Sequence, residues 1–209
     1  MERPSDSFEN GGTGGDPYLQ ARVTDFLDSL AERTPAPGGG AAAAVTCAMA
    51  AALVEMATSF GSARGLERVH RRAGELRREV QLLAHADGEA YGVVIEALRM
   101  PPGNERHQSL DAAVGGAIAC PIKILEIASE VATLAADVAE TGNRNLEGDA
   151  LTGALLAEAA ARSAATLAQL NVSLLSRHAS ADAHLQELRP ALARATRARE
   201  RAVSAYAAV

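Results

Sequence analysis

Apolar residues recur at helical spacing along nearly the whole chain, and no stretch alternates convincingly with the two-residue period of a β-strand. The segment 17–33 is an example, because five of its apolar residues fall on one stripe of a helix. These residues are Leu19, Val23, Phe26, Leu27 and Leu30. The same spacing, interrupted by glycine, proline and polar residues, predicts further helices at 41–59, 66–100, 104–140, 149–178 and 181–207.

Helices of this length, ~45 Å for 30 residues, favour antiparallel neighbours when short loops join them. The chain is therefore predicted to be all-α, an antiparallel bundle of five to six long helices that forms one domain over residues 17–209. Residues 1–16 are polar and rich in glycine, which predicts a disordered tail. Pro121 and Pro190 lie inside predicted helices, and each is expected to bend or divide its helix, because proline removes a hydrogen bond.

The composition fits closely packed helices. Hydrophobic residues make up 48% of the chain, but aromatic residues only 3%, and tryptophan is absent. A core without large rings is filled by alanine, leucine, valine and isoleucine, which favours helices over a β-sandwich. Such a bundle is long and thin and leaves much surface uncovered, so we expect a homodimer that buries one face.

Charge and cysteine usage limit the possible partners and cellular location of the protein. The formal net charge is −6, which argues against nucleic acid as a partner. Cys47 and Cys120 show no metal-ligand spacing and are interpreted as small buried residues in a reducing cytoplasm, with a disulfide left open. The run 41–57 is long enough to suggest a membrane span, but alanine is barely hydrophobic and Glu55 interrupts it. With no signal peptide visible at the start of the chain, a cytoplasmic protein without a membrane segment is predicted.

The segment 34–40, TPAPGGG, leads directly into an alanine-rich helix. Its prolines hold the chain extended, and its three glycines remove every β-carbon where the helix begins. The first N–H groups of a helix have no internal partners and attract anions. The segment therefore predicts either a pocket that a ligand approaches closely or a tight loop that binds nothing.

Asp87 is the main candidate for chemistry. Val80, Leu83, Asp87, Tyr91 and Val94 follow one another at helical steps, which places this carboxylate on an apolar stripe. Burial raises the pKa of a carboxyl group and makes it a usable proton donor and acceptor near neutral pH. The alternative is an aspartate at the edge of the stripe that reaches water or pairs with an arginine.

Three further polar residues are candidates. Asn143 and Asp149 lie near a predicted helix start, where Asp149 is either a ligand group or simply a residue that complements the helix dipole. Asn171 lies within an apolar helix, where its amide needs a backbone or ligand partner. The chain has no catalytic triad, phosphate loop, dinucleotide fingerprint or metal-ligand cluster, so neither a metal nor a nucleotide cofactor is expected.

These motifs together resemble a known family, the cyclodeaminase domain of formiminotransferase-cyclodeaminase and its stand-alone bacterial relatives, which include methenyltetrahydrofolate cyclohydrolases. The resemblance covers the chain from about Tyr18 to Leu175. The matching residues are 26–31 and 34–40, 52–56, 86–91, 96–101, Arg106 with Pro121 in 119–122, Gly142 and Asn143 with Asp149, and Asn171.

The resemblance implies an all-helical homodimer that acts on a one-carbon derivative of tetrahydrofolate without a cofactor. The reaction would be closure of formiminotetrahydrofolate with loss of ammonia, or interconversion of the methenyl and 10-formyl forms with water. Asp87 takes the place of the family's catalytic aspartate. The implied substrate-binding residues are Pro37, Gly38, Gly39, Gly40, Asn143, Asp149 and Asn171.

Three departures from the family pattern leave an alternative open. The segment after the glycine-rich helix is shortened to about 59–65, Pro102 replaces a common lysine, and Leu167 replaces the first of two asparagines. These changes affect anionic substrate binding more than proton transfer. The alternative is therefore a catalytically inactive helical dimer that binds folate or serves a structural role.

Overall fold

The computed structural model describes residues 17–61, 65–174 and 180–207, and most of them are helical. No strand occurs within those ranges, so the all-α prediction is confirmed. The predicted tail, 1–16, lies outside the described residues. The elements are α1 Pro17–Gln20, α2 Val23–Ala31, α3 Gly39–Ser59, α4 Leu66–Arg99, α5 Asn104–Thr141, the 3-10 turn η1 Arg144–Leu146, α6 Glu147–Leu174 and α7 Ser180–Ala207.

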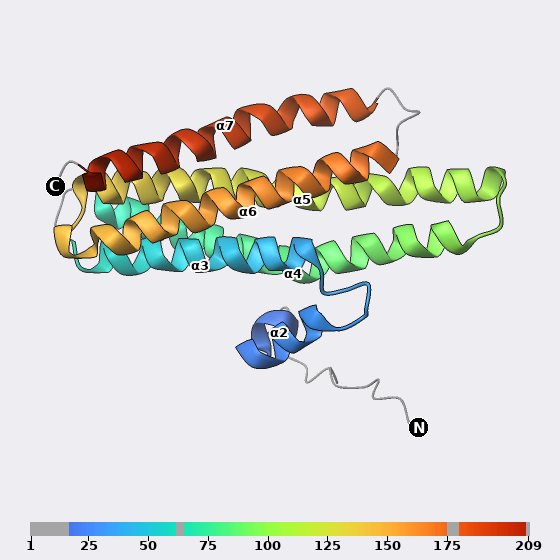
Figure 1. Ribbon diagram of the computed structural model, residues 1–209, viewed down its shortest axis with the longest axis horizontal. Coiled ribbons are helices and arrows are strands. Elements are labelled where there is room, and N and C mark those ends of the chain that lie inside the picture. Colours follow the sequence, from blue (N-terminus) through green and yellow to red (C-terminus); the bar gives the residue numbers. More distant parts are fainter. Residues whose placement is uncertain (1–16, 62–64, 175–179, 208–209) are drawn as a thin grey trace.

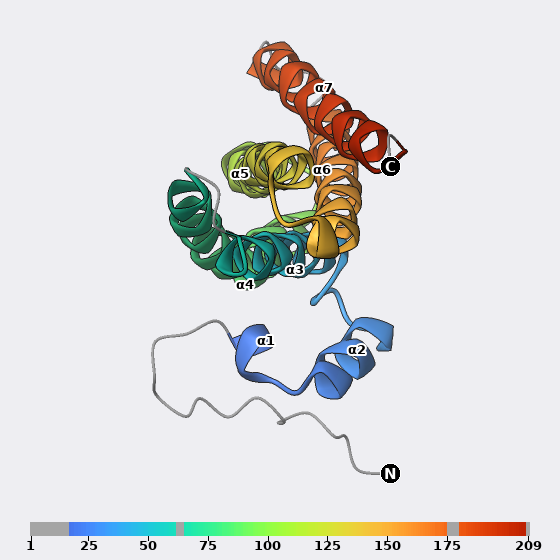
Figure 2. The same ribbon diagram turned by 90° about the vertical axis from the view of Figure 1, so that its left-hand side faces the viewer.

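The long helices α3 to α7 run alternately up and down along one direction (Figure 1). α5 packs against α3, α4, α6 and α7 and so forms the centre of the bundle. Viewed end-on, the other four helices form an arc around it (Figure 2). α4 and α5 extend beyond the ends of α3 and α6 as a paired arm (Figure 1).

Small side chains make this close packing possible. Ala44, Ala50 and Ala51 of α3 are fully buried, as are Ala154 and Ala161 of α6. Because alanine projects only one methyl group, helix axes that meet through it approach closely. The larger buried side chains lie mainly on the central helix, which gives them neighbours on several sides. They include Ile118, Ile124, Leu125 and Val131.

The predicted first helix is in fact two short helices. Arg22 is extended, with φ −64° and ψ 148°, and its carbonyl accepts the N–H of Phe26 at 3.0 Å as α2 begins. The break lets the ring of Tyr18 fold back onto that of Phe26, with 5.9 Å between the ring centroids. Phe26 is 7% exposed, so burial of one aromatic ring favours the bend over a continuous helix.

Pro121 does not divide its helix, so of the two expected outcomes, a bend or a division, the division is ruled out. α5 is one helix from Asn104 to Thr141 with Pro121 inside it. Proline has no N–H, so the carbonyl of Ala117, four residues earlier, lacks its helical partner. Asn171 of α6 donates its Nδ2 to that carbonyl at 2.7 Å. The neighbouring helix therefore satisfies the group that proline leaves open. α7 likewise continues through Pro190.

Two helices, α3 and α5, are long and apolar enough to cross a membrane when judged by length and composition alone. More than half of the apolar window of each helix, 56% in α3 and 61% in α5, is buried inside the bundle. Core helices of soluble proteins have the same character, so these two helices are weak evidence for a membrane span.

Candidate active site

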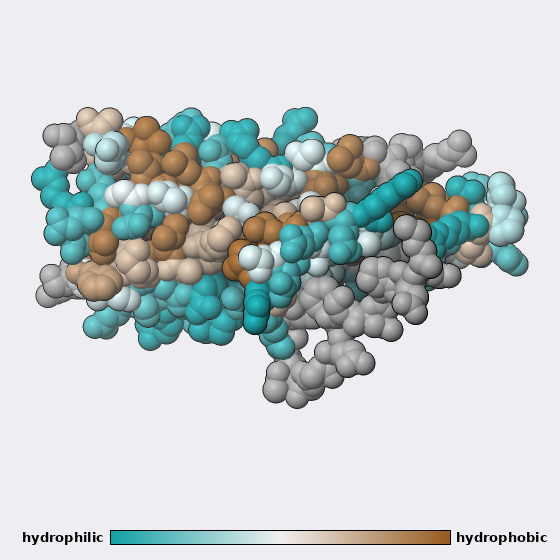
Figure 3. Space-filling view, turned by 60° about the horizontal axis from the view of Figure 1, so that its bottom comes forward, coloured by the Kyte–Doolittle hydropathy of each residue, from teal (hydrophilic) through white to brown (hydrophobic). Residues whose placement is uncertain are grey.

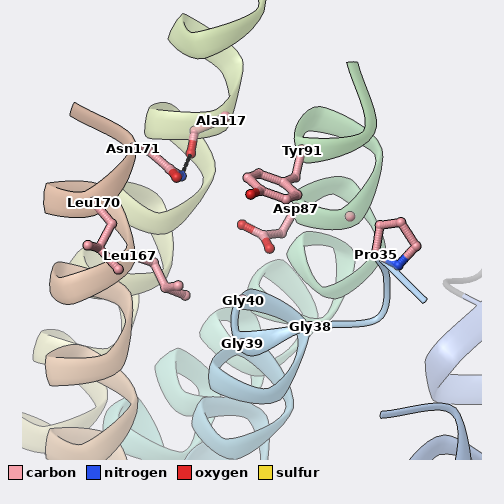
Figure 4. Close-up of a pocket in the computed structure, with 11 residues that line it drawn as sticks. Pro35, Gly38, Gly39, Gly40, Asp87, Tyr91, Ala117, Leu167, Leu170 and Asn171 are labelled. Carbon is pink, nitrogen blue, oxygen red and sulfur yellow. Dashed lines mark hydrogen bonds between the residues drawn. The ribbon is translucent and has the colours of Figure 1, made fainter. Parts of the chain in front are cut away.

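A pocket of about 330 Å³ lies where α3 begins, between α3, α4, α5 and α6 (Figure 4). Residues from five separate parts of the sequence meet there: the loop before α3, the first turn of α3, the second half of α4, the first half of α5 and the last turns of α6. The lining residues are Pro35, Gly38, Gly39, Gly40, Asp87, Gly88, Tyr91, Ala117, Leu167, Leu170 and Asn171.

The glycine-rich segment forms one wall of this pocket. Gly38 is the N-cap of α3 and carries no side chain to cap the helix, so α3 begins at Gly39 with bare backbone. Gly39 and Gly40 form its first turn and also line the pocket. Pro37 is buried but does not line the pocket, whereas Pro35 does. The structure thus brings together three of the four predicted binding residues of this segment.

Asp87 enters the pocket from α4 and lies directly against Gly40 (Figure 4). A β-carbon built on Gly40 would be 1.9 Å from Oδ2 and 2.1 Å from Cγ of Asp87, which is far inside van der Waals contact. In the described part of the chain, Gly65 is the one glycine whose φ lies between about +20° and +160°, so the conformation of Gly40 suits any residue. Gly40 is therefore needed for space, and a carboxylate occupies that space.

The carboxyl group of Asp87 is left without a charged partner. No ion pair or hydrogen bond to it is formed by the residues that the structure describes. Burial is the main cause that raises its pKa above the ordinary value of 3.8. The same side chain helps, after burial itself, to raise the pKa of the Cys120 thiol to about 12. A carboxyl group with a raised pKa holds its proton more tightly than an ordinary aspartate and is a stronger proton acceptor once ionised.

The opposite wall of the pocket combines polar and apolar side chains. Asn171 contributes its amide, and apolar surface comes from Leu170, the residue before it, and from Leu167, one turn earlier on α6. Tyr91 follows Asp87 by one turn of α4 and brings an aromatic ring that is 38% exposed. Sequence reasoning had not assigned Tyr91 to the site, although its spacing of four residues from Asp87 is the signal that indicates it.

Asn143 and Asp149 lie at the other end of the bundle within one chain. The Oδ1 of Asn143 accepts the N–H of Asn145 at 3.0 Å, and its Nδ2 donates to the carbonyl of Phe60 at 3.3 Å. Phe60 follows the last residue of α3, which is ~30 Å from its first turn for a helix of this length. Asp149 lies in the first turn of α6. The structure gives both residues local positions and does not bring them to the pocket of their own chain.

The pocket holds one carboxylate and no set of metal ligands. In the ranges that the structure describes, no group of three histidine, cysteine, aspartate or glutamate side chains is placed to bind a metal ion. What the lining residues can do is bind a flat, partly apolar molecule and move a proton at Asp87.

Comparison with known proteins gives the family of the chain. Residues 22–190 match the family described as Formiminotransferase-cyclodeaminase. The chain belongs to this family. The resemblance found in the sequence motifs is thereby confirmed. A methenyltetrahydrofolate cyclohydrolase of Methylorubrum extorquens is 34% identical over 192 residues, which are 86% of this chain and 92% of that protein.

Two other relatives differ in how much of them the chain covers. A formimidoyltransferase-cyclodeaminase of Dictyostelium discoideum is 29% identical over 66% of this chain, but the chain spans only 27% of that protein. The crystal structure of a formiminotetrahydrofolate cyclodeaminase from Thermotoga maritima superposes with a TM-score of 0.82 at 28% identity and covers 90% of this chain and 96% of that one. The chain therefore corresponds in length to stand-alone members of the family.

One departure from the family pattern falls inside the pocket. Leu167 stands where the resemblance leads us to expect an asparagine, and its two terminal methyl groups lie 3.5 Å from where a β-carbon of Gly39 would be. This replacement makes the α6 wall more apolar. Asn171, the second asparagine of the motif, is present and lines the pocket.

Proposed function

We propose that this protein catalyses a ring-opening or ring-closing reaction on a tetrahydrofolate one-carbon derivative, as a methenyltetrahydrofolate cyclohydrolase or a formiminotetrahydrofolate cyclodeaminase. Asp87 is the general acid and base. The single observation that carries the proposal is the half-buried Asp87 carboxyl group, which lies in a pocket against bare backbone and pairs with no cation of the described residues.

The chemistry of both reactions suits such a group. In the cyclohydrolase reaction, water attacks the cationic methenyl carbon and a carboxylate accepts one of its protons. The bond from that carbon to one folate nitrogen then breaks as the nitrogen gains a proton and the new hydroxyl group loses its own to become the formyl oxygen, so one proton is released overall. In the cyclodeaminase reaction, a folate nitrogen attacks the formimino carbon and loses a proton, and the departing ammonia gains one. One carboxyl group with a raised pKa can serve both transfers, and its negative charge stabilises a cationic substrate.

The remaining lining residues are proposed to hold the substrate. Gly38 and Gly39 present bare backbone to a flat ring, and Tyr91 and Leu170 provide apolar contact. Asn171 provides an amide. No metal ion or organic cofactor is part of the proposal, so treatment with a chelator should leave turnover unchanged. Turnover that is lost on chelation and restored by a metal ion would contradict this point.

A homodimer is also proposed, and the exposed side of α3 and α6 is its interface. Outward stripes of these adjacent helices carry no charged residue, and Met49 and Leu155 on them are 50% and 46% exposed. In Figure 3, hydrophobic side chains gather along this side of the bundle, above a border of hydrophilic ones. Two helices of this length offer roughly 700 Å², close to what each partner buries in a standard interface. The stripes consist of Val45, Met49, Ala52 and Met56, and of Thr152, Leu155, Ala159, Ser163, Thr166 and Leu170.

Sedimentation analysis of Met49→Glu tests this interface. A charge in the middle of the uncharged stripe should dissociate the dimer, because it would be buried without a partner. Leu82→Glu is the matched control, since Leu82 is 61% exposed on α4, outside the interface. A monomeric wild-type protein, or two variants that behave alike, would remove this part of the proposal.

The reaction itself is tested by absorbance. Purified protein is mixed with 5,10-methenyltetrahydrofolate, whose loss reports cyclohydrolase activity, and then with 5-formiminotetrahydrofolate, from which methenyl absorbance appears in the cyclodeaminase reaction. Turnover of either substrate that is lost in Asp87→Asn supports the proposal. Folate binding without turnover in the wild-type protein would support an inactive folate-binding dimer. A protein that neither binds nor turns over folate would support a structural role.

We further propose a cytoplasmic location without nucleic acid or membrane partners, on the acidic composition and the burial of α3 and α5.

A further inference from the structure

The hydrogen bond between α6 and α5 joins a proline to the pocket. Pro121 lies inside α5 and does not line the pocket, whereas Ala117, one turn before it, and Asn171 both do. The Nδ2 of Asn171 donates to the carbonyl of Ala117 at 2.7 Å (Figure 4). In an uninterrupted helix that carbonyl would accept the N–H of residue 121, which proline lacks. The carbonyl is available to Asn171 because residue 121 is proline.

This contact also fixes which atoms of the amide remain for a ligand. A backbone carbonyl can only accept a hydrogen bond, so the contacting atom of Asn171 must be its amide nitrogen. With Nδ2 held by Ala117, rotation of the amide is prevented, and Oδ1 keeps one orientation. Asn171 therefore offers the pocket a fixed acceptor in place of an amide free to turn either way.

We propose that Pro121 is a positioning residue for the substrate-binding site. By leaving the carbonyl of Ala117 open, it locks the amide of Asn171 so that Oδ1 accepts a hydrogen bond from an N–H-bearing edge of the substrate. A pterin has such an edge in its amino-pyrimidine part. The substrate side of this inference rests on the proposed function. The coupling of Pro121 to Asn171 does not, and it is measured separately.

The coupling is tested by thermal unfolding of Pro121→Ala, Asn171→Ala and the double variant. In the wild-type background, Asn171→Ala leaves the carbonyl of Ala117 without a partner and should lower Tm by several degrees. In the Pro121→Ala background a backbone N–H now reaches that carbonyl, so the same change should lower Tm by less than half as much. Equal decreases in the two backgrounds would overturn the inference, whatever the activity of the protein.

The positioning role is tested by kinetics. Pro121→Ala should raise KM for methenyltetrahydrofolate about tenfold and change kcat less than about threefold, because Asp87 is untouched while one substrate contact loses its fixed geometry. Its Tm should not fall, since a helix gains a hydrogen bond. Pro190→Ala is the matched control: it also removes a proline from inside a helix, α7, but away from the pocket, and should leave KM unchanged.

The outcomes separate the two proposals. If the wild-type protein turns over neither substrate, the Tm cycle still reports on the coupling, and the dissociation constant of 5-formyltetrahydrofolate replaces KM as the measure of positioning. A Pro121→Ala protein that retains wild-type KM and dissociation constant would overturn the positioning role. Coupling in Tm together with weaker folate binding supports the inference even in a protein without catalysis.

Discussion

Two carboxyl groups of this protein, the buried Glu158 and the half-buried Asp87, have opposite surroundings. Glu158 on α6 is 8% exposed and accepts hydrogen bonds from Arg162 at 2.8 and 3.1 Å and from Arg199 on α7 at 3.1 Å. Burial by itself would raise the pKa of Glu158, but the two arginines outweigh it and the pKa is lowered. Asp87 has burial without arginine, and its pKa is raised.

The difference distinguishes a structural role, that of Glu158, from the chemical role proposed for Asp87. A carboxylate that joins two helices is ionised at all working pH values and has cations to stabilise it. The Asp87 carboxyl group, by contrast, forms no ion pair or hydrogen bond with any residue that the structure describes. It remains in the pocket at a cost in stability, because a charge removed from water without a partner is unfavourable. Groups retained at such a cost cluster at functional sites, which supports a chemical role for Asp87.

The largest effect on activity is expected from Asp87→Asn. Loss of the titrating group removes general acid and base catalysis, so kcat should fall about 10²–10⁴-fold. The Tm should stay equal or rise, because the amide is neutral. Steady-state assays with methenyltetrahydrofolate and a thermal melt check both parts. An active Asp87→Asn protein would mean that the reacting proton moves elsewhere.

Gly40→Ala should reduce kcat by about 10- to 100-fold, because the new methyl group displaces the Asp87 carboxyl group from its position. Gly39→Ala is the matched control on the preceding residue, since its β-carbon would meet Leu167 at 3.5 Å, an ordinary contact. Because Gly39 lines the pocket, this variant should raise KM, but its kcat should change less than about threefold, since Asp87 keeps its position. The kcat values of the two variants, compared under one set of conditions, decide whether space for the carboxylate is the reason for glycine at position 40.

Glu158→Gln should act on stability alone. The variant leaves Arg162 and Arg199 with a weaker partner, so the free energy of unfolding should fall by about 1–2 kcal/mol, discounted because both arginines are partly exposed. In a chain of this size that corresponds to a Tm lower by about 2–8 °C. Turnover per folded molecule should be unchanged, and a large loss of kcat would contradict the division of roles drawn above.

The pH dependence of stability should run in opposite directions for the two carboxyl groups. The raised pKa of Asp87 destabilises the fold as pH rises above 3.8 and through the raised value, so the advantage of Asp87→Asn in Tm should grow over that interval and then level off. The lowered pKa of Glu158 contributes stability above 4.5 that is lost as pH falls through the lowered value. The Tm deficit of Glu158→Gln should therefore shrink in acid. Melts from about pH 3 to pH 8 measure both trends.

Local rules explain which predictions succeeded. The long helices were predicted because their apolar spacing persists over many turns, and α4 and α5 end close to where Met100 and Glu140 marked the expected limits. The break at Arg22 was missed because it depends on Tyr18 packing against Phe26. That α5 stays undivided at Pro121 could not be predicted from this helix alone, because the donor that replaces the missing N–H comes from Asn171, on another helix.

For the candidate site, too, the properties of a single helix could be predicted and the contacts between helices could not. Asp87 was found because its position on an apolar stripe is a property of one helix. The grouping of Asn143 and Asp149 with the glycines is not seen within one chain, because proximity between distant segments depends on how the helices pack.

The sequence by itself determined the helical class, the family and the carboxyl group available for chemistry, since periodicity and motifs are written along the chain. Only the tertiary structure decided that Gly40 leaves room for Asp87 and that Pro121 governs Asn171. Both relations join helices that are far apart in sequence, and the contact distances that create them exist only after the helices have packed.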